Sequence, residues 1–177
     1  MTIRHWVWKP LHRNEQSGDP MCDAISLSIK HLPTKYHSYP AIQARLTGRG
    51  GEEEVQFFYD RKPFPPLLPI ILDDQFRIVR WGNRQRKSKL LPHTGRVEKW
   101  ELAQGLWQHS DIQEVLITGS AALHRGVWFP LLEGIQGIYL RDEYGTPTVF
   151  MLMDKPSDYY GIMTKSRVMP VIVGDSI

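Results

Sequence analysis

Short apolar segments, separated by turn-forming residues, constrain the fold of this chain more than any other feature of its sequence. Ile25, Leu27 and Ile29 alternate with small polar residues, which is the period of a half-buried strand. Further strand-like segments lie at 55–59, 70–72, 76–81, 115–117, 126–129, 138–140, 148–153 and 169–173. Strands therefore outnumber helices, and we predict an α+β chain in which one or two helices pack on a sheet or an open barrel.

Turn residues and apolar spacing also predict how some segments join. Asp73 and Asp74 form a turn that pairs 70–72 with 76–81 as a hairpin, and the turn at 142–145 pairs 138–140 with 148–153. A short helix is expected over 41–46. Apolar side chains at helical spacing predict a second helix over 96–109 with its stripe facing the core. Ser157 is the expected cap of a final helical turn.

Length and composition favour one domain in a reducing compartment. The 177 residues suit a domain at 21–177, preceded by an extension at 1–20 that ends in a turn sequence. A single cysteine, Cys22, excludes an intramolecular disulfide, and the residue type alone favours a small buried hydrophobe at this position. No apolar run approaches the roughly 20 residues of a membrane span. We expect a cytoplasmic monomer without a membrane partner.

The most unusual segment is a basic stretch at 77–99, in which Glu98 is the only acidic residue. Its cations are Arg77, Arg80, Arg84, Arg86, Lys87, Lys89, Arg96 and Lys99. Such clustering is typical of a phosphate-binding surface, where Trp81 would stack on a base and Gly82 would admit a strand close to the main chain. Arg96 and Glu98 would begin the helix over 96–109, where backbone N–H groups favour an anion. The alternative is a solvated loop, because runs of charge usually lie on solvated surface. The net charge of +3 and the pI near 9.0 are too mild to indicate a nucleic-acid partner, so only the clustering of the charges is informative.

The order of several short motifs resembles the SRAP family, the SOS-response-associated peptidases that shield abasic sites in single-stranded DNA by covalent attachment. Family members begin Met-Cys-Gly-Arg and later show Trp-Gly-Leu, Asn-Ala-Arg-x-Glu-Thr and His-Asp-Arg-Met-Pro-Val-Ile-Leu. The matching positions here are Met21-Cys22-Asp23, Tyr59-Asp60 with Pro63, 68–71, Trp81-Gly82-Asn83, 94–98, 125–137 and 167–173. The resemblance implies a β-rich SRAP-like fold, in which mixed sheets form an open barrel with a few packed helices.

The resemblance also implies a catalytic role for Cys22. In the family, the free α-amine of an N-terminal cysteine attacks the aldehyde of the abasic sugar, and the thiol then closes a thiazolidine. Cys22 could do this after removal of the first twenty-one residues, or if translation starts at Met21. In an intact chain only thiol chemistry or plain binding remains.

Other family positions are changed, so the enzyme assignment stays open between abasic-site crosslinking and autoprocessing by a cysteine peptidase with degenerate catalytic residues. Thr94 replaces the family asparagine, and Arg96 and Glu98 keep the arginine and the glutamate that follow it. The catalytic glutamate falls on Gly137, with Glu133 close by in sequence, and the histidine falls on Ser166. The remaining substitutes for that histidine are His93, His109 and His124.

We therefore predict a protein of the DNA damage response that binds single-stranded or abasic DNA in a basic groove. Cys22, Thr94 and Glu133 are the candidate catalytic residues. The candidate DNA-binding residues are Trp81, Gly82, Arg84, Arg86, Lys87, Lys89, Arg96 and Glu98. No zinc spacing or nucleotide-binding loop is found, so no metal or organic cofactor is expected. The alternatives are a catalytically inactive interaction or regulatory module with a protein partner, and a peptidase that cuts before Cys22.

Overall fold

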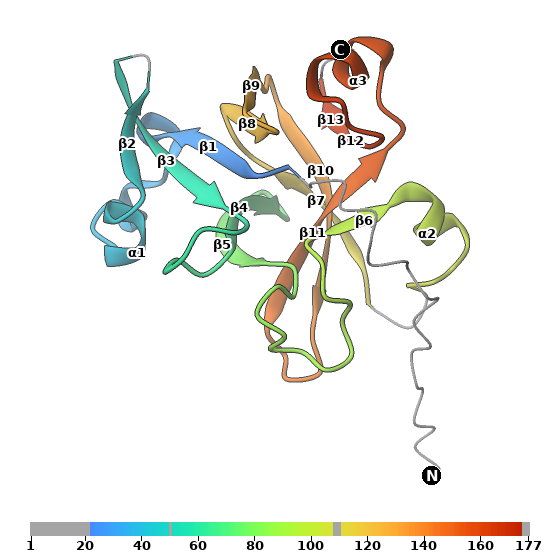
Figure 1. Cartoon of the computed structure of the whole chain (residues 1–177). Helices are drawn as coiled ribbons and strands as arrows, with labels where there is room; N and C mark the ends of the chain where they lie inside the picture. The colour runs from blue at the N-terminus through green and yellow to red at the C-terminus, as the bar shows by residue number, and fades with distance from the viewer. Residues whose placement is uncertain (1–21, 50, 108–110, 175–177) are drawn as a thin grey trace.

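The strands of the molecule form two sheets that share a core. The computed structural model describes residues 22–49, 51–107 and 111–174 (Figure 1). The first sheet is antiparallel throughout, with the order β2-β3-β1-β8-β9. Its strands are β1 (Ala24–Ser28), β2 (Leu46–Arg49), β3 (Glu52–Phe58), β8 (Ala121–His124) and β9 (Val127–Pro130). The division into an extension and one domain stays a prediction, because residues 1–21 lie outside the described part.

The second sheet contains a closed ring of strands. The ring consists of β4 (Leu67–Leu72), β5 (Gln75–Trp81), β7 (Gln113–Ile117), β10 (Gly134–Arg141) and β11 (Pro147–Asp154). Neighbours are antiparallel except β11 and β5, whose parallel pairing closes the ring. The short strands β6 (Arg96–Glu98), β12 (Met169–Pro170) and β13 (Ile172–Val173) extend it. The predicted β-rich, barrel-like α+β class is confirmed, with a ring that is closed rather than open.

Both predicted hairpins are present, in each case because the turn residues suit the turn. Asp73 and Asp74 adopt positive φ angles of 50° and 58° and join β4 to β5. At the second hairpin, the Asp142 carboxylate accepts hydrogen bonds from the backbone N–H groups of Tyr144 and Thr146, both at under 3 Å. This turn brings β10 back as β11 and fixes the end of the barrel at which the basic stretch lies.

The helices are few and short. They are the 3₁₀ turns η1 (Ile29–His31) and η2 (Thr34–Tyr36), with α1 (Pro40–Gln43), α2 (Lys99–Ala103) and α3 (Asp158–Thr164). Ser157 caps α3 by accepting a hydrogen bond from Tyr160 N, as predicted. Among the described residues, no helix has the length and apolar character that crossing a membrane requires.

The predicted helix over 96–109 is wrong in its extent and its orientation. Residues 96–98 form β6, which pairs in parallel with β11, and the helix α2 begins only after Glu98. Glu98 and Glu101 make a capping box at that point, and Gly105 with φ 72° follows the last turn. Trp100 is 45 % exposed and donates from Nε1 to Glu98, so the apolar spacing does not describe a core stripe.

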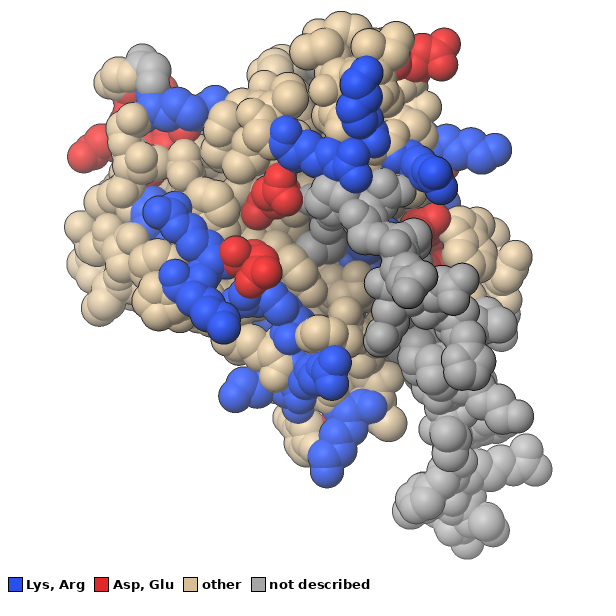
Figure 2. All heavy atoms as spheres, in the orientation of Figure 1, with Lys and Arg blue, Asp and Glu red and all other residues tan. Residues whose placement is uncertain are grey.

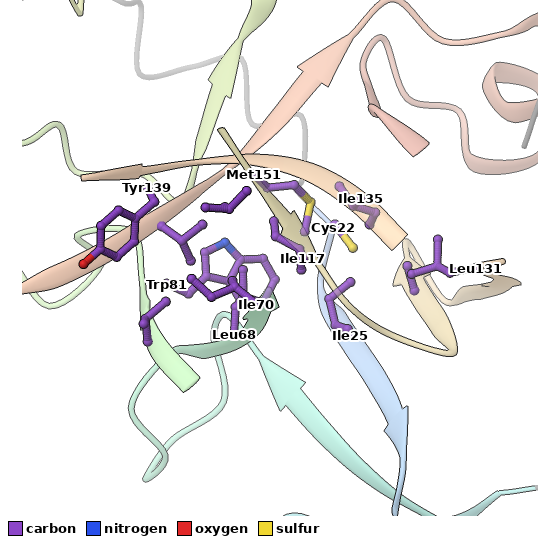
Figure 3. Close-up of a cluster of buried hydrophobic side chains, with 14 of the residues drawn as sticks. Cys22, Ile25, Leu68, Ile70, Trp81, Ile117, Leu131, Ile135, Tyr139 and Met151 are labelled. Atoms are coloured by element: carbon purple, nitrogen blue, oxygen red, sulfur yellow. The ribbon is translucent and has the colours of Figure 1, made fainter. Parts of the chain in front are cut away.

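The main core fills the barrel and the space between the barrel and the first sheet. Figure 3 shows Ile25 of β1 near Leu68, Ile70, Trp81 and Ile117 of the barrel. Alternation along the strands explains the arrangement, since Val79 and Trp81, two residues apart on β5, are both buried. The interior is therefore a packed core.

Candidate nucleic-acid interface

The middle of the basic stretch forms a loop, residues 82–95, which connects β5 to β6. The loop extends from one end of the barrel beside the turn between β10 and β11 (Figure 1). Hydrogen bonds within the loop and to the turn between β10 and β11 hold it in place, as the contacts of Asn83 and Glu143 show. A loop fixed in this way presents its exposed side chains in a defined arrangement.

Asn83 organises the interior of the loop. Its buried side-chain amide donates to the carbonyls of Ser88 and Leu91 at 2.9 and 2.8 Å, and its Oδ1 accepts from Ser88 N at 3.0 Å. Its backbone N–H donates to the carbonyl of Thr94 at 2.9 Å. These bonds connect the start, the middle and the end of the loop. The sequence contained one sign of this role. Asparagine side chains commonly form hydrogen bonds with backbone groups nearby in the chain, and Asn83 follows directly after Trp81 and Gly82.

Glu143 attaches the loop to the turn between β10 and β11. Its carboxylate accepts hydrogen bonds from Ser88 Oγ and from Lys89 N, each at 2.6 Å. Burial raises the pKa of Glu143, but these hydrogen bonds outweigh it and lower the pKa overall. The anionic form thus secures the middle of the loop.

Several cations of the basic stretch already have carboxylate partners. Arg80 pairs with buried Asp142 at 2.7 Å, and Lys99 pairs with Asp154 at 2.8 Å. Arg84 donates to the Asp60 carboxylate and to the carbonyl of Phe64, the latter at 3.3 Å. Arg84 was predicted to meet phosphate, but it mainly connects the loop to the segment between β3 and β4.

The exposed cations of the loop 82–95 and of the neighbouring segment between β3 and β4 form what we call the basic surface. Its members come from the loop 82–95 and from the segment that Arg84 tethers to it, and they are Arg61, Lys62, Arg86, Lys87 and Lys89. None of them has a carboxylate partner among the described residues. Figure 2 shows Lys and Arg side chains in a band over this part of the molecule, interrupted by few acidic ones. The basic surface therefore has uncompensated positive charge.

Two predicted contacts to nucleic acid are wrong because both residues are buried. Trp81 is 0 % exposed, its Nε1 donates to the carbonyl of Gly95 at 3.0 Å, and its ring contacts Tyr59. A base has no access to that ring. Gly82 has φ 58°, and a Cβ added there would collide with the Thr94 carbonyl and Gly95, so its missing side chain admits the end of its own loop.

Cys22, the predicted nucleophile, lies in the core. It is 0 % exposed, and Figure 3 shows it among Ile117, Ile135 and Met151. Its thiol donates toward the carbonyls of Ala24 and Leu123 at 3.4 and 3.3 Å, and burial raises the pKa of the thiol. The role as an accessible nucleophile is therefore not supported, and the alternative of a small buried hydrophobe is confirmed.

The other candidate catalytic residues are not gathered around Cys22. Thr94 closes the loop 82–95, where its Oγ1 accepts from Arg96 N at 3.3 Å. Glu133 is exposed in the turn between β9 and β10, next to Gly174. Among the described residues, no hydrogen bond joins any two of Cys22, Thr94 and Glu133. Arg96 belongs to β6, apart from the exposed cations of the loop.

A buried histidine–tyrosine pair lies close to Cys22 and was not predicted. His124 of β8 and Tyr160 of α3 are both buried, and Nδ1 lies 2.6 Å from the tyrosine hydroxyl. Burial raises the pKa of Tyr160, and the nearby Cys22 and Asp23 raise it further. The pair joins α3 to the first sheet. Of the other candidate histidines, His93 bonds to the Arg84 carbonyl, and His109 lies outside the described residues.

Comparisons with known proteins identify no relative of this chain. No family model, no curated protein and no solved structure matches it. The structure itself adds that no group of three or more His, Cys, Asp or Glu side chains in its described part is arranged to hold a metal ion.

Proposed function

We propose that this protein binds single-stranded nucleic acid, in particular DNA, through the phosphates of the strand. One observation carries the proposal: the basic surface joins exposed Arg and Lys side chains from two segments that Arg84 holds together. Phosphate groups release condensed counterions when such cations neutralise them, which drives binding without any base contact.

The construction of the basic surface favours a single strand over a duplex. Its cations lie on loops, and no described helix contributes to it. Readers of duplex sequence commonly place a helix or a two-stranded ribbon in the major groove, whereas single strands follow grooves of positive charge. A flexible strand adapts to the tethered loops at a lower cost than a stiff duplex.

The proposal is limited to noncovalent binding. Covalent capture would require an exposed Cys22 with a reactive thiol or a free amine, and the burial of this residue gives that chemistry no support. Abasic DNA should therefore bind in the same way as any other single strand, through its phosphates.

Fluorescence anisotropy with a labelled oligothymidine and a duplex of equal length tests the proposal. The affinity for the single strand should fall linearly on a log–log plot as salt rises, with a slope of about −0.7 for each neutralised phosphate. Engagement of three to five cations of the basic surface predicts a slope of about −2 to −3.5. Binding that does not respond to salt, or no binding at low salt, would refute the proposal.

A protein partner is the second candidate, and α3 is the observation that favours it. Tyr159, Ile162 and Met163 share one face of this helix and are 63 %, 65 % and 48 % exposed. Contiguous exposed apolar side chains often mark protein contacts. In this case Ile162→Ser would weaken association with the partner while leaving the affinity for oligothymidine unchanged.

A further inference from the structure

A small pocket lies next to the basic surface and shares Arg61 with it. The pocket is a partly open hollow with a volume of ≈ 210 Å³, and it is lined by the residues that follow α1, by β2 and β3, and by the segment before β4. The side chains that matter for recognition are Arg45, Thr47, Gln56, Phe58, Arg61 and Phe64. This volume is below the roughly 300 Å³ at which sites for drug-sized ligands begin, so the occupant must be a small group.

Two arginines in the wall lie over aromatic rings. The Arg45 guanidinium carbon is 4.8 Å from the centre of the Phe64 ring, and that of Arg61 is 4.6 Å from the centre of the Phe58 ring. Each guanidinium plane is thus supported from one side by a ring. A flat group that enters the pocket has a guanidinium or aromatic surface on which to stack.

Arg45 is held in place by other parts of the fold. It is 6 % exposed and donates from Nη1 to the Ala41 carbonyl and from Nη2 to the Pro65 carbonyl, at 2.6 and 2.8 Å. Burial lowers the pKa of its guanidinium, and no carboxylate pairs with it among the described residues. The Arg45 guanidinium is therefore fixed in the wall of the pocket, and its charge suits a ligand that carries a nearby phosphate.

The pocket also offers hydrogen-bonding groups for the edge of a ring. Thr47 contributes a hydroxyl and Gln56 a side-chain amide, and neither group has a hydrogen-bond partner among the described residues. A threonine and a glutamine provide both donors and acceptors. Stacking surfaces combined with such groups are how proteins commonly hold an unpaired base.

We propose that this pocket takes one nucleobase of a strand whose phosphates lie on the basic surface. The assignment rests on the proposed function, because the strand must be bound there for its base to reach the pocket. Arg61 links the two sites, since its guanidinium plane stacks on the base while its charge faces the backbone. Binding is noncovalent, and no bond is made or broken.

The test separates the base from the phosphates. Two strands of equal length are compared: one consists entirely of tetrahydrofuran abasic units, and the other carries a single thymine at its centre. Both have the same phosphates, so the basic surface binds them alike. If the pocket takes the base, the thymine strand binds at least about fivefold more tightly, as expected for one stacked base.

Two matched substitutions distinguish stacking from charge. Arg61→Lys keeps the charge but loses the planar group, so the thymine preference should disappear while the affinity for the abasic strand stays within about twofold. Arg86→Lys makes the same change on the basic surface outside the pocket and should keep the preference. Melting temperatures of both variants check that the fold is intact.

Each other outcome has a definite meaning. Equal affinity of the wild-type protein for the two strands overturns the pocket assignment but leaves the proposed function standing. The same holds if Arg61→Lys and Arg86→Lys affect the preference equally. Absence of binding to either strand overturns the proposed function and the pocket assignment with it.

Discussion

The Glu143 carboxylate accepts a hydrogen bond from Ser88 Oγ at 2.6 Å, although the two residues are 55 positions apart in the sequence. This contact, with a second one from Lys89 N, joins the loop 82–95 to the turn between β10 and β11. The exposed cations of the loop are therefore carried by a segment with fixed attachment points. Both the stability of the loop and its binding properties should depend on these points.

The attachment through Glu143 predicts an acid-sensitive loop. The pKa of Glu143 is lowered in the folded state, so its contribution to stability is present above its ordinary pKa, about 4.3, and is lost as the pH falls through the lowered value. Hydrogen exchange should show a protection factor for the Lys89 amide that decreases in acid. Glu143→Gln should reduce it already at pH 7. The Gln104 amide, which bonds within the region of α2, serves as a control. A Lys89 protection factor that keeps its pH 7 value down to the onset of acid unfolding would contradict this account.

Asn83 should be the most sensitive polar residue of the loop. Asn83→Ala removes three side-chain hydrogen bonds and leaves the Ser88 and Leu91 groups without their partner, so we expect a loss of about 2–4 kcal/mol in the free energy of unfolding. The exposed neighbour Gln85 makes no comparable bonds to other described residues, and Gln85→Ala should stay within about 0.5 kcal/mol. Urea denaturation measures both. Similar losses for the two variants would show that Asn83 does not organise the loop.

Alanine substitutions at Gly82 and Gly126 should distinguish the effect of a steric clash from the effect of backbone strain. Both have positive φ angles, 58° and 79°, so alanine is strained at either site by about 1 kcal/mol. At Gly126 no atom lies within 4 Å of the added Cβ, whereas at Gly82 the Cβ would collide with the Thr94 carbonyl. Gly82→Ala should therefore be clearly more destabilising in thermal unfolding. Equal changes in melting temperature would mean that the end of the loop moves aside freely.

The strands could be predicted from the sequence, but the burial of individual side chains could not. Alternation and turn chemistry are local, so the hairpin through Asp73 and Asp74 was correctly predicted. The same alternation, continued from Val79 to Trp81, points the tryptophan into the barrel, but the adjacent charges suggested a surface role instead. The closure of the ring depends on the pairing of β11 with β5, which are far apart in the sequence. A local sequence pattern does not predict such a pairing.

The site was predictable only in part for a related reason. The clustered charge in the sequence correctly located the loop. Its exposed cations Arg86, Lys87 and Lys89 are accessible to a nucleic-acid strand. Ion pairs with carboxylates distant in the sequence decide which of the other cations can bind phosphate. The ion pair between Arg84 and Asp60 is an example that sequence spacing does not predict. The contribution of Arg61 was missed because it lies outside the basic stretch.

Burial of Cys22 predicts an unreactive thiol in the native protein. A raised pKa keeps the sulfur protonated at pH 8, and the core excludes reagents from it. Alkylation by iodoacetamide, followed by intact mass, should be far slower in buffer than in urea. Because the protein has only this cysteine, the added mass reports on a single site. Rapid alkylation in buffer would restore the case for a reactive cysteine.

Neutralising the loop cations should weaken nucleic-acid binding through charge alone. The triple variant Arg86→Gln, Lys87→Gln, Lys89→Gln removes up to three phosphate contacts, so the slope of log K against log salt should become less steep by about 2. These side chains are exposed and have no carboxylate partner among the described residues, so the melting temperature should change little.

The matched control for this variant removes the same charge at the other end of the molecule. Lys155, Lys165 and Arg167 are exposed around α3, and their replacement by Gln lowers the net charge equally. If the basic surface is the binding site, this control keeps a salt slope close to that of the wild-type protein. If both triple variants lose slope and affinity to the same extent, the attraction is a property of the net charge, and no local site exists.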